Sequence, residues 1–351
     1  MVVVFKGAHG WITLELNKCY VITYFAVLCY HIIVVFKRIV MRTSFFTLLM
    51  SIFFAAQLSA APRVITDIAP VHGLVSRVMV GVGTPGLIVP PGSSPHDFSF
   101  TPSNARELAD STVVFWVGEA LAPWLQKTIS SISKNALSVE LLPSDPSLLL
   151  PVRSGGGHQH SNDSHQHSNE EYDPHAWLDP FIACQWLNVI AKKLAEVDPQ
   201  NAQKYLFNAK VGQAEIKGVT AKVGAKLLSP STAPFVAYHD AYRYLDRRFG
   251  LKFLGAFADS DATPPSARRA ANLSQKIRER PEICVITEPQ YSSNFLQMVS
   301  TGSDVRHAVI DPLGSNIPIG PNFYTSFLTM IGNTLSSCIQ TSNQSTSKST
   351  K

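Results

Sequence analysis

The sequence predicts an α/β protein of two lobes, each a mostly parallel sheet wrapped by helices, with a long rigid helix joining them. Three observations lead to this prediction. Short apolar runs alternate with segments of helical periodicity in each half of the chain, as in parallel sheets covered by helices. One helical pattern of unusual length separates the halves. The 351 residues are 45% hydrophobic and 10% aromatic, which is enough to fill sizeable cores in about two domains.

The first lobe is expected over residues 61–199. Short apolar runs predict its strands, at Arg63–Asp67, Leu87–Val89, Val113–Val117 and Ser138–Leu142. Apolar residues at helical spacing predict its helices, over Pro70–Val80, Pro102–Asp110, Glu119–Ile132 and Asp179–Val197. Residues 154–171 interrupt this pattern with a His-rich stretch of low complexity that has no apolar residue to bury. We expect that stretch to form a mobile surface loop.

A linking helix is expected over residues 200–229. Its apolar residues recur near the 3.6-residue period, at Tyr205, Ala209, Ile216, Val219, Val223 and Leu227. Three glycines in the same segment each cost about 1 kcal/mol relative to alanine. Tertiary packing must therefore hold this helix together, and Pro230 and Pro234 end it.

The second lobe, over residues 230–339, repeats the alternation. Its strands are predicted at Phe235–Tyr238, Leu251–Phe257, Ile283–Thr287 and Ala308–Asp311. Its helices are predicted at Ala241–Phe249, Pro265–Arg280, Ser293–Ser300 and Phe323–Ser337. The tail over residues 340–351 is polar and rich in Ser and Thr, and we expect it to be disordered.

Residues 41–60 have the three-part pattern of a secretory signal peptide. Arg42 gives a positive start, a largely apolar run of 13 residues follows from Ser44 to Ala56, and small residues come next. That run is too short to span a bilayer. Small and apolar residues at the −3 and −1 positions predict cleavage after Ala60. The protein is therefore expected to be exported to the periplasm.

Residues 1–40 contain a second apolar stretch, from Val21 to Phe36. It could be a membrane anchor, but two adjoining apolar segments with Met41 and Arg42 between them favour an over-extended N-terminus and translation from Met41. No cysteine stands at the end of the signal's apolar run, so lipid attachment is not indicated.

Charge argues against nucleic acid as a partner. The whole chain has a formal charge of +5, but without the first 60 residues it has 25 basic and 24 acidic side chains. A body so close to neutral lacks the basic surface that binds phosphates.

Three cysteines follow the signal segment. An oxidising compartment permits one disulfide and one remaining thiol. Cys284 lies in an apolar strand-like run, and Cys338 lies near the chain end, where a bond would hold down the last helix. Cys184 lies within a predicted helix and is expected to be a small buried residue. We predict the pair Cys284–Cys338.

Three histidines lie at the ends of predicted strands or in loops. His96 follows the second strand, His175 follows the His-rich insert, and His239 comes directly after the strand that ends at Tyr238. Ligands of parallel α/β sheets gather beyond the carboxyl ends of strands. Two of these histidines come from the first lobe and one from the second, so they could meet only in a cleft between the lobes. Three imidazoles with a carboxylate, such as Asp311, or a water form a tetrahedral set suited to Zn²⁺.

Other histidines fall into two groups. Four lie within the insert, at His158, His160, His165 and His167. Imidazoles on a flexible chain chelate divalent metals weakly and without fixed geometry, although a merely solubilising loop is the alternative. His72 and His307 have no matching partners, and we expect both to be structural.

These stretches together resemble the ZnuA-like zinc-specific solute-binding proteins of bacterial ABC importers. The resemblance covers roughly residues 61–339. Its markers are the His-rich insert and the motifs HDFSFTPS at His96, DPHAWLDP at His175, FVAYHDAYRYLDRRFGL at His239, ITEPQ at Glu288 and VIDPLG at Asp311. Together these motifs are highly specific, whereas any one of them alone would not be.

The resemblance implies two lobes joined by a rigid helix, with the metal in the cleft. It implies that His96, His175 and His239 are the ligands and that the carboxylate of Asp311 faces the metal. Manganese-binding relatives tend to have Glu where His239 stands, so zinc is favoured. Some zinc-binding members have an acidic residue directly before the first ligand; Pro95 stands there and cannot ligate, so the fourth position falls to Asp311 or water.

The implied function is that of a monomeric periplasmic protein that binds Zn²⁺ with high affinity and delivers it to an inner-membrane ABC permease, without catalysis. The family's paired cysteines match Cys284 and Cys338. The insert would capture extra zinc for the cleft or sense its abundance.

Three alternatives remain. One is the same fold binding Mn²⁺ or Fe²⁺. Another is a secreted zinc hydrolase with Glu288 or Asp240 as its base, which the lack of an HExxH motif and the scattered ligands disfavour. The third is an adhesin-like surface role, for which no lipid anchor is indicated.

Overall fold

The computed structural model divides the chain into two compact units, residues 1–60 and residues 61–351. The residues that it describes are 2–7, 10–15, 26–40, 61–142, 145–153, 172–228, 233–258, 263–289, 295, 299 and 305–340. The expected signal segment, the His-rich insert and most of the tail lie outside these residues. So does most of the helix expected over 293–300, of which Phe295 and Val299 are helical.

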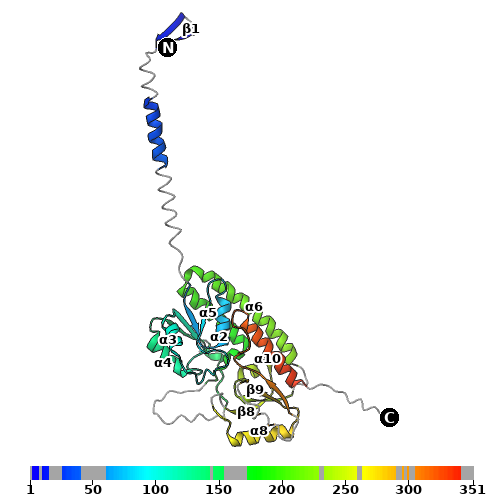
Figure 1. Cartoon of the computed structure of the whole chain (residues 1–351). Coiled ribbons are helices and arrows are strands. Elements are labelled where there is room, and N and C mark those ends of the chain that lie inside the picture. The colour runs from blue at the N-terminus through cyan, green and yellow to red at the C-terminus, as the bar shows by residue number, and fades with distance from the viewer. Residues whose placement is uncertain are drawn as a thin grey trace, which may run out of the picture. The chain divides into compact units, whose positions relative to one another are not determined.

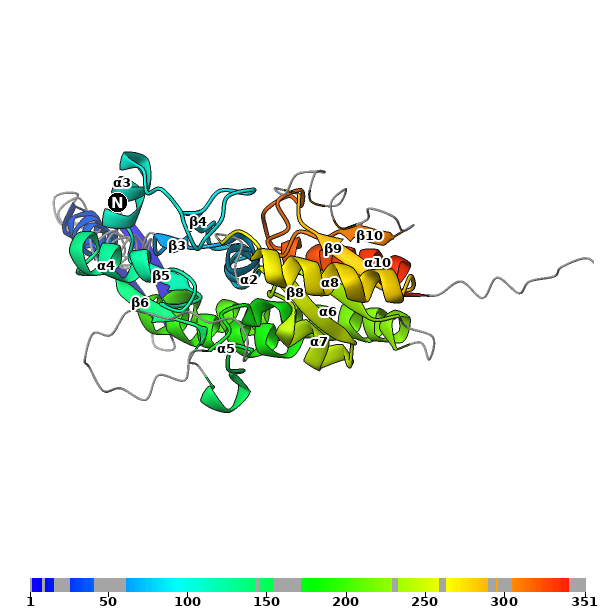
Figure 2. The ribbon, with the colours of Figure 1, turned by 90° about the horizontal axis from the view of Figure 1, so that it is seen from below.

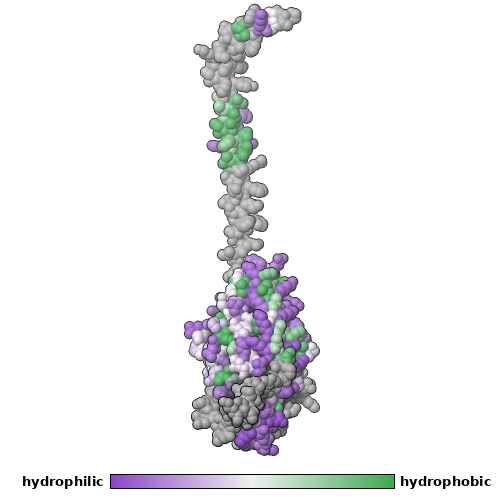
Figure 3. Space-filling view, turned by 90° about the vertical axis from the view of Figure 1, so that its right-hand side faces the viewer, coloured by the Kyte–Doolittle hydropathy of each residue, from purple (hydrophilic) through white to green (hydrophobic). Residues whose placement is uncertain are grey.

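The first unit contains a strand pair and a helix. Strands β1 (Val2–Gly7) and β2 (Gly10–Glu15) pair in antiparallel fashion, and residues 26–40 are helical. This helix exposes many apolar side chains, among them Leu28 and Phe36 (Figure 3). No helix among the described residues is both long and apolar enough to cross a membrane.

The first lobe is built on a parallel sheet of order β4-β3-β5-β6, whose strands are labelled in Figure 2. Its strands are β3 (Val64–Thr66), β4 (Gly86–Leu87), β5 (Val113–Trp116) and β6 (Leu137–Glu140). Its helices are α2 (Ala69–Val78), α3 (Pro102–Ala109), α4 (Pro123–Ile132) and α5 (Pro180–Val197). Every residue of β5 is buried, as expected for a central strand covered on both faces.

Local chemistry sets the helix ends in this lobe. The Thr101 side chain accepts the backbone N–H of Asn104 and caps α3, and the Asp179 carboxylate accepts that of Phe181 at the start of α5. The expected start of α4 at Glu119 was wrong. Gly118 has a φ of 145° and its carbonyl accepts the N–H of Leu121, so a turn precedes the helix.

The second lobe contains a parallel sheet of order β10-β9-β7-β8 (Figure 2). Its strands are β7 (Phe235–His239), β8 (Phe253–Ala258), β9 (Cys284–Thr287) and β10 (Arg306–Val309). Its helices are α7 (Arg243–Phe249), α8 (Ala267–Glu279) and α10 (Phe323–Ile339). Strand β10 ends two residues before the expected Asp311, because Asp311 begins a turn in which its carbonyl accepts the N–H of Gly314.

Alternate residues of the central strands pack against different cores. Cys284 and Ile286 face the large core shared with the first lobe. Val285 faces a smaller core, which also contains Leu273 and Ile277 of α8. The sheet is thus covered on both faces, which explains why these strands are continuous apolar runs.

Helix α6 (Ala202–Leu227) joins the lobes. It packs against α2 and α5 of the first lobe and α10 of the second (Figure 1). Gly212 and Gly332 lie at these contacts. A Cβ on Gly212 would meet the Leu187 side chain at 3.1 Å, and one on Gly332 would meet Val223 at 2.6 Å. Glycine therefore permits the close approach of helices that holds α6 in place.

A disulfide fastens the last helix to the sheet. Cys284 at the start of β9 is bonded to Cys338 in the last turn of α10, with 5.7 Å between their Cα atoms. This is the pair expected from the sequence. Cys184 is free and buried in α5, also as expected.

Two glycine-to-alanine substitutions test the packing of α6. Gly332→Ala should lower the free energy of unfolding by about 1–3 kcal/mol, because its methyl group would clash with the stiff β-branched side chain of Val223. Gly218→Ala is the matched control, since nothing lies within 4 Å of its added Cβ. It should raise stability by up to about 1 kcal/mol. Urea denaturation of both variants measures this, and equal effects would contradict the packing.

Candidate metal centre

His239 is the last residue of β7 and is 2% exposed. Its Nδ1 forms a short hydrogen bond with the carboxylate of Glu288, which directly follows the neighbouring strand β9. A carboxylate only accepts hydrogen bonds, so the ring donates from Nδ1–H. In the neutral imidazole, Nε2 then has the lone pair that a metal ligand needs.

His175 is held in the same way from the first lobe. It precedes the short 3-10 helix η3 (Ala176–Leu178) and is 4% exposed. The Asp173 carboxylate accepts both the His175 Nδ1–H, at 2.8 Å, and its backbone N–H, at 2.9 Å. The backbone N–H of Asp173 donates in turn to the carbonyl of Leu150 at 2.8 Å. The ring is thereby fixed with its Nε2 atom directed toward the interface between the lobes.

The two Nε2 atoms face each other across this interface at 3.4 Å. The ring centroids lie 5.3 Å apart. Two nitrogen ligands of a tetrahedral zinc ion, each about 2.0–2.1 Å from the metal, lie about 3.3–3.4 Å apart. A shared cation between the two nitrogens would be attracted to both. The pair thus has the spacing of two metal ligands.

His96 lies beside this pair, in the loop between β4 and α3. Its ring centroid is 5.6 Å from that of His175. Trp124 anchors the loop, because its Nε1–H donates to the carbonyl of Pro95 at 2.9 Å. The rings of Phe98 and Phe100 also contact Trp124, with centroids 5.6 and 6.0 Å away. Pro95, which cannot ligate, therefore helps to position the neighbouring histidine.

Asp311 follows β10, and its carboxylate accepts backbone N–H groups of Leu313 at 2.8 Å and Ser315 at 2.6 Å. The carboxylate of Asp311 has further lone pairs beyond those used in these two hydrogen bonds, and these could bind a metal as a fourth ligand. Within the described residues, no group of three or more His, Cys, Asp or Glu side chains has the geometry to hold a metal ion. The full ligand set of His96, His175, His239 and Asp311 therefore stays a prediction.

Several polar contacts join the lobes around the centre. The Trp177 indole N–H donates to the carbonyl of Pro312 at 2.8 Å, and the Tyr324 hydroxyl donates to the carbonyl of Trp177 at 2.7 Å. Arg248 of α7 forms a two-pronged ion pair with Asp179, at 2.6 and 2.8 Å. These contacts hold the two lobes together.

A further ion pair stands directly after His239. Arg153 donates to the Asp240 carboxylate at 2.9 Å and also pairs with Asp246. Burial raises the pKa of Asp240, while the positive charge of Arg153 lowers it. The charge of Asp173 raises this pKa further, and a positive charge on His175 or His239 would lower it, so Asp240 lies close enough to both rings to interact with them electrostatically.

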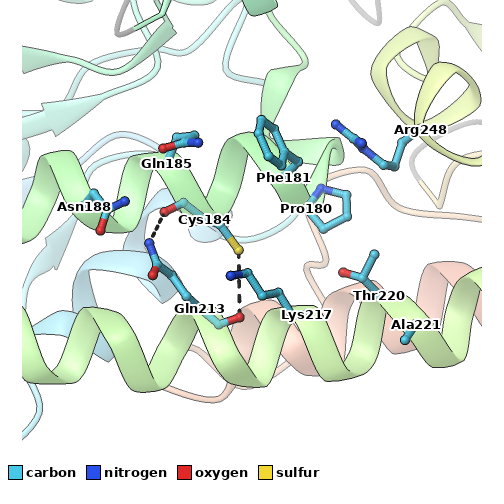
Figure 4. Close-up of a pocket in the computed structure, with 10 residues that line it drawn as sticks. All are labelled: Pro180, Phe181, Cys184, Gln185, Asn188, Gln213, Lys217, Thr220, Ala221 and Arg248. Atoms are coloured by element: carbon cyan, nitrogen blue, oxygen red, sulfur yellow. Dashed lines mark hydrogen bonds between the residues drawn. The ribbon is translucent and has the colours of Figure 1, made fainter.

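The structure also contains a cavity of about 470 Å³ between α5 and α6, away from the imidazoles (Figure 4). Its lining residues include Cys184 and Lys217 but no histidine or carboxylate. Burial raises the pKa of the Cys184 thiol to about 11, which disfavours the thiolate that binds metals. This cavity does not offer a second metal site.

The sequence did not reveal every residue of the centre. Asp173 was missed, although its place two residues before a histidine is a usable signal for a local hydrogen bond. Glu288 was noted only as a motif residue and as a possible hydrolase base. His72 is buried, with its Nε2–H donating to the carbonyl of Pro85 at 3.1 Å, and His307 is exposed on β10. The four histidines of the insert lie outside the described residues.

Comparison with known proteins gives a family match over most of the chain. The model of the family ZnuA, "Zinc-uptake complex component A periplasmic", matches residues 64–338. The high-affinity zinc uptake system protein ZnuA of Brucella abortus is 34% identical over 304 residues, which cover 79% of this chain and 91% of that protein. The protein of the same name from Yersinia pestis is 30% identical over 293 residues, 80% of this chain and 92% of the relative.

Solved structures share the fold. A crystal structure of ZnuA matches with a TM-score of 0.68 at 20% identity, covering 80% of this chain and 100% of that one. The laminin-binding adhesin Lmb of Streptococcus agalactiae matches with a TM-score of 0.67 at 22% identity and the same coverage. At these identities the likeness establishes the two-lobed architecture alone.

Replacing the carboxylates behind the imidazoles tests the centre. Asp173→Asn and Glu288→Gln should each weaken zinc binding by about 10–100-fold, because an amide no longer fixes and polarises the ring. Competition with a chromophoric chelator measures the affinity.

Asp198→Asn is the control for these variants. Asp198 is also a buried carboxylate, but it accepts hydrogen bonds from Tyr205 and Asn201 and not from a histidine. Wild-type affinity in Asp173→Asn and Glu288→Gln would contradict the roles assigned to these carboxylates.

Proposed function

The chain belongs to the ZnuA family of periplasmic zinc-uptake components, and from this premise we propose that His96, His175 and His239 together hold the Zn²⁺ that it carries. The observation that supports this most directly is the 3.4 Å separation of the His175 and His239 Nε2 atoms. Asp311 or a water molecule completes a tetrahedral set. The family is a binding component for metal uptake and not an enzyme, so the hydrolase alternative is set aside.

Zinc is favoured over Mn²⁺ and Fe²⁺ by the donor atoms. The proposed ligands are three imidazole nitrogens and at most one carboxylate, and such a set suits Zn²⁺ better than the harder Mn²⁺. Asp173 and Glu288 are occupied by hydrogen bonds to the imidazoles. They orient the nitrogen donors and do not compete with them for the metal.

Transport follows from the division of ligands between the lobes. His96 and His175 come from the first lobe and His239 from the second, so bound zinc stabilises the arrangement in which the lobes meet. Zinc release requires these imidazoles to separate. We propose that docking on an inner-membrane ABC permease separates them, and that the protein acts as a periplasmic monomer after cleavage behind Ala60.

The His-rich insert is proposed to bind additional zinc weakly through His158, His160, His165 and His167. Both of its flanks lie near the centre. Pro151 and Tyr172 form an isolated bridge, and Asp173 comes directly after. The described residues on both sides of the insert thus lie close to the cleft, whether the insert supplies zinc or senses it.

Zinc titration of a protein lacking residues 155–171 tests these ligands. The deletion should remove the weak sites and leave one tight site, because the proposed ligands lie outside the deleted segment. In that background, His96→Ala, His175→Ala or His239→Ala should each remove tight binding, measured by calorimetry and by metal content after dialysis.

His307→Ala serves as the control, since His307 is exposed on β10 and should leave the tight site intact. The proposal fails if the deletion alone abolishes the tight site. It also fails if zinc remains tightly bound in all three histidine variants, or if the protein prefers Mn²⁺.

A further inference from the structure

Three carboxylates near the imidazole pair have different partners. Asp173 and Glu288 accept the Nδ1–H groups of His175 and His239. Asp240, the residue directly after His239, is bound to neither ring in these hydrogen bonds but is paired with Arg153. The Asp240 carboxylate could act as a hard oxygen donor to a metal ion. Its negative charge is balanced by the ion pair with Arg153.

Arg153 reaches Asp240 from the other lobe. It lies at the end of the described segment 145–153 of the first lobe, and its guanidinium contacts three residues of the second lobe. One guanidinium nitrogen donates to Asp240 at 2.9 Å, another pairs with Asp246, and Cζ lies 4.0 Å from the centroid of the Phe253 ring. The side chains of Arg153 and Asp240 are only 27% and 21% exposed. A planar guanidinium held on three sides is a fixed partner.

Whether the Asp240 carboxylate is paired with Arg153 or coordinates the metal affects which metal the centre prefers. Nitrogen-rich donor sets suit Zn²⁺, whereas added carboxylates suit Mn²⁺. Asp240 is adjacent in the chain to His239, one of the proposed ligands. If Asp240 joined the centre, the donor set would change in the direction that favours the harder ion.

We propose that Arg153 is a specificity-determining positioning residue, which keeps Asp240 out of the coordination shell and so preserves a zinc-preferring site. This rests on the ligands given under the proposed function. Asp246 and Phe253 support the role, because they hold the guanidinium so that an incoming cation does not displace it from Asp240. Without Arg153, Asp240 and Asp246 would lose the guanidinium that is paired with both of them, and a divalent cation would replace its charge.

The test compares Arg153→Met with the wild type in the full chain at one equivalent of metal, so that the tightest site fills first. Methionine keeps an apolar stem against Phe253 but removes the charge. The ratio of zinc to manganese affinity should fall by about tenfold or more. Bound Co²⁺ should lose intensity in its visible bands, since an added carboxylate raises the coordination number above four.

Two further variants separate this role from a merely structural one. Arg153→Lys keeps the positive charge and should retain most of the metal preference. The double variant Arg153→Met with Asp240→Asn removes the released donor, and it should restore the wild-type affinity ratio and the intense Co²⁺ bands.

Arg248→Met is the matched control. Arg248 also joins the lobes through an Asp, namely Asp179, and its Cζ lies 5.0 Å from the centroid of the Phe181 ring. Its loss should leave the metal preference unchanged.

An unchanged affinity ratio and Co²⁺ spectrum in Arg153→Met would overturn the inference while leaving the proposed function intact. A double variant that behaves like Arg153→Met would also overturn it, as would an equal loss of preference in Arg248→Met. Failure of the wild-type protein to bind one zinc ion tightly would instead refute the proposed function.

Discussion

The structure depends on one geometric constraint: the Nε2 atoms of two imidazoles are held 3.4 Å apart by carboxylates behind their rings. Asp173 and Glu288 keep each ring from turning, because each carboxylate holds its ring at Nδ1. A cation between the two Nε2 atoms would be attracted to both, so the geometry that the carboxylates fix favours metal binding.

The fold supplies the rigidity that this constraint needs. His239 ends a strand buried on both faces, and the carboxylate that holds it follows the neighbouring parallel strand, so one sheet edge fixes both. The partner imidazole comes from the other lobe. Helix α6, packed closely through glycine contacts, and the hydrogen bonds of Trp177 keep the lobes from sliding. The disulfide from Cys338 to β9 ties the last helix to the same sheet.

Much of this was visible in the sequence, for identifiable reasons. Apolar runs buried on both faces gave the strands, and the position of His239 at a strand end followed from the period of that pattern. The start of α4 was misplaced because a left-handed glycine, Gly118, lies where helical periodicity already begins. Arg153 carried no local signal, since its partners Asp240 and Asp246 are 87 and 93 residues away. Pairings of that kind depend on how the lobes meet, which periodicity does not encode.

The central claim is that imidazoles from both lobes share one ion. X-ray absorption at the zinc edge, on protein loaded with one equivalent of zinc, tests it most directly. The account predicts a four-coordinate zinc with three imidazole nitrogens at about 2.0–2.1 Å and one oxygen. A first shell dominated by oxygen, one that contains sulfur, or one with a single imidazole would contradict it.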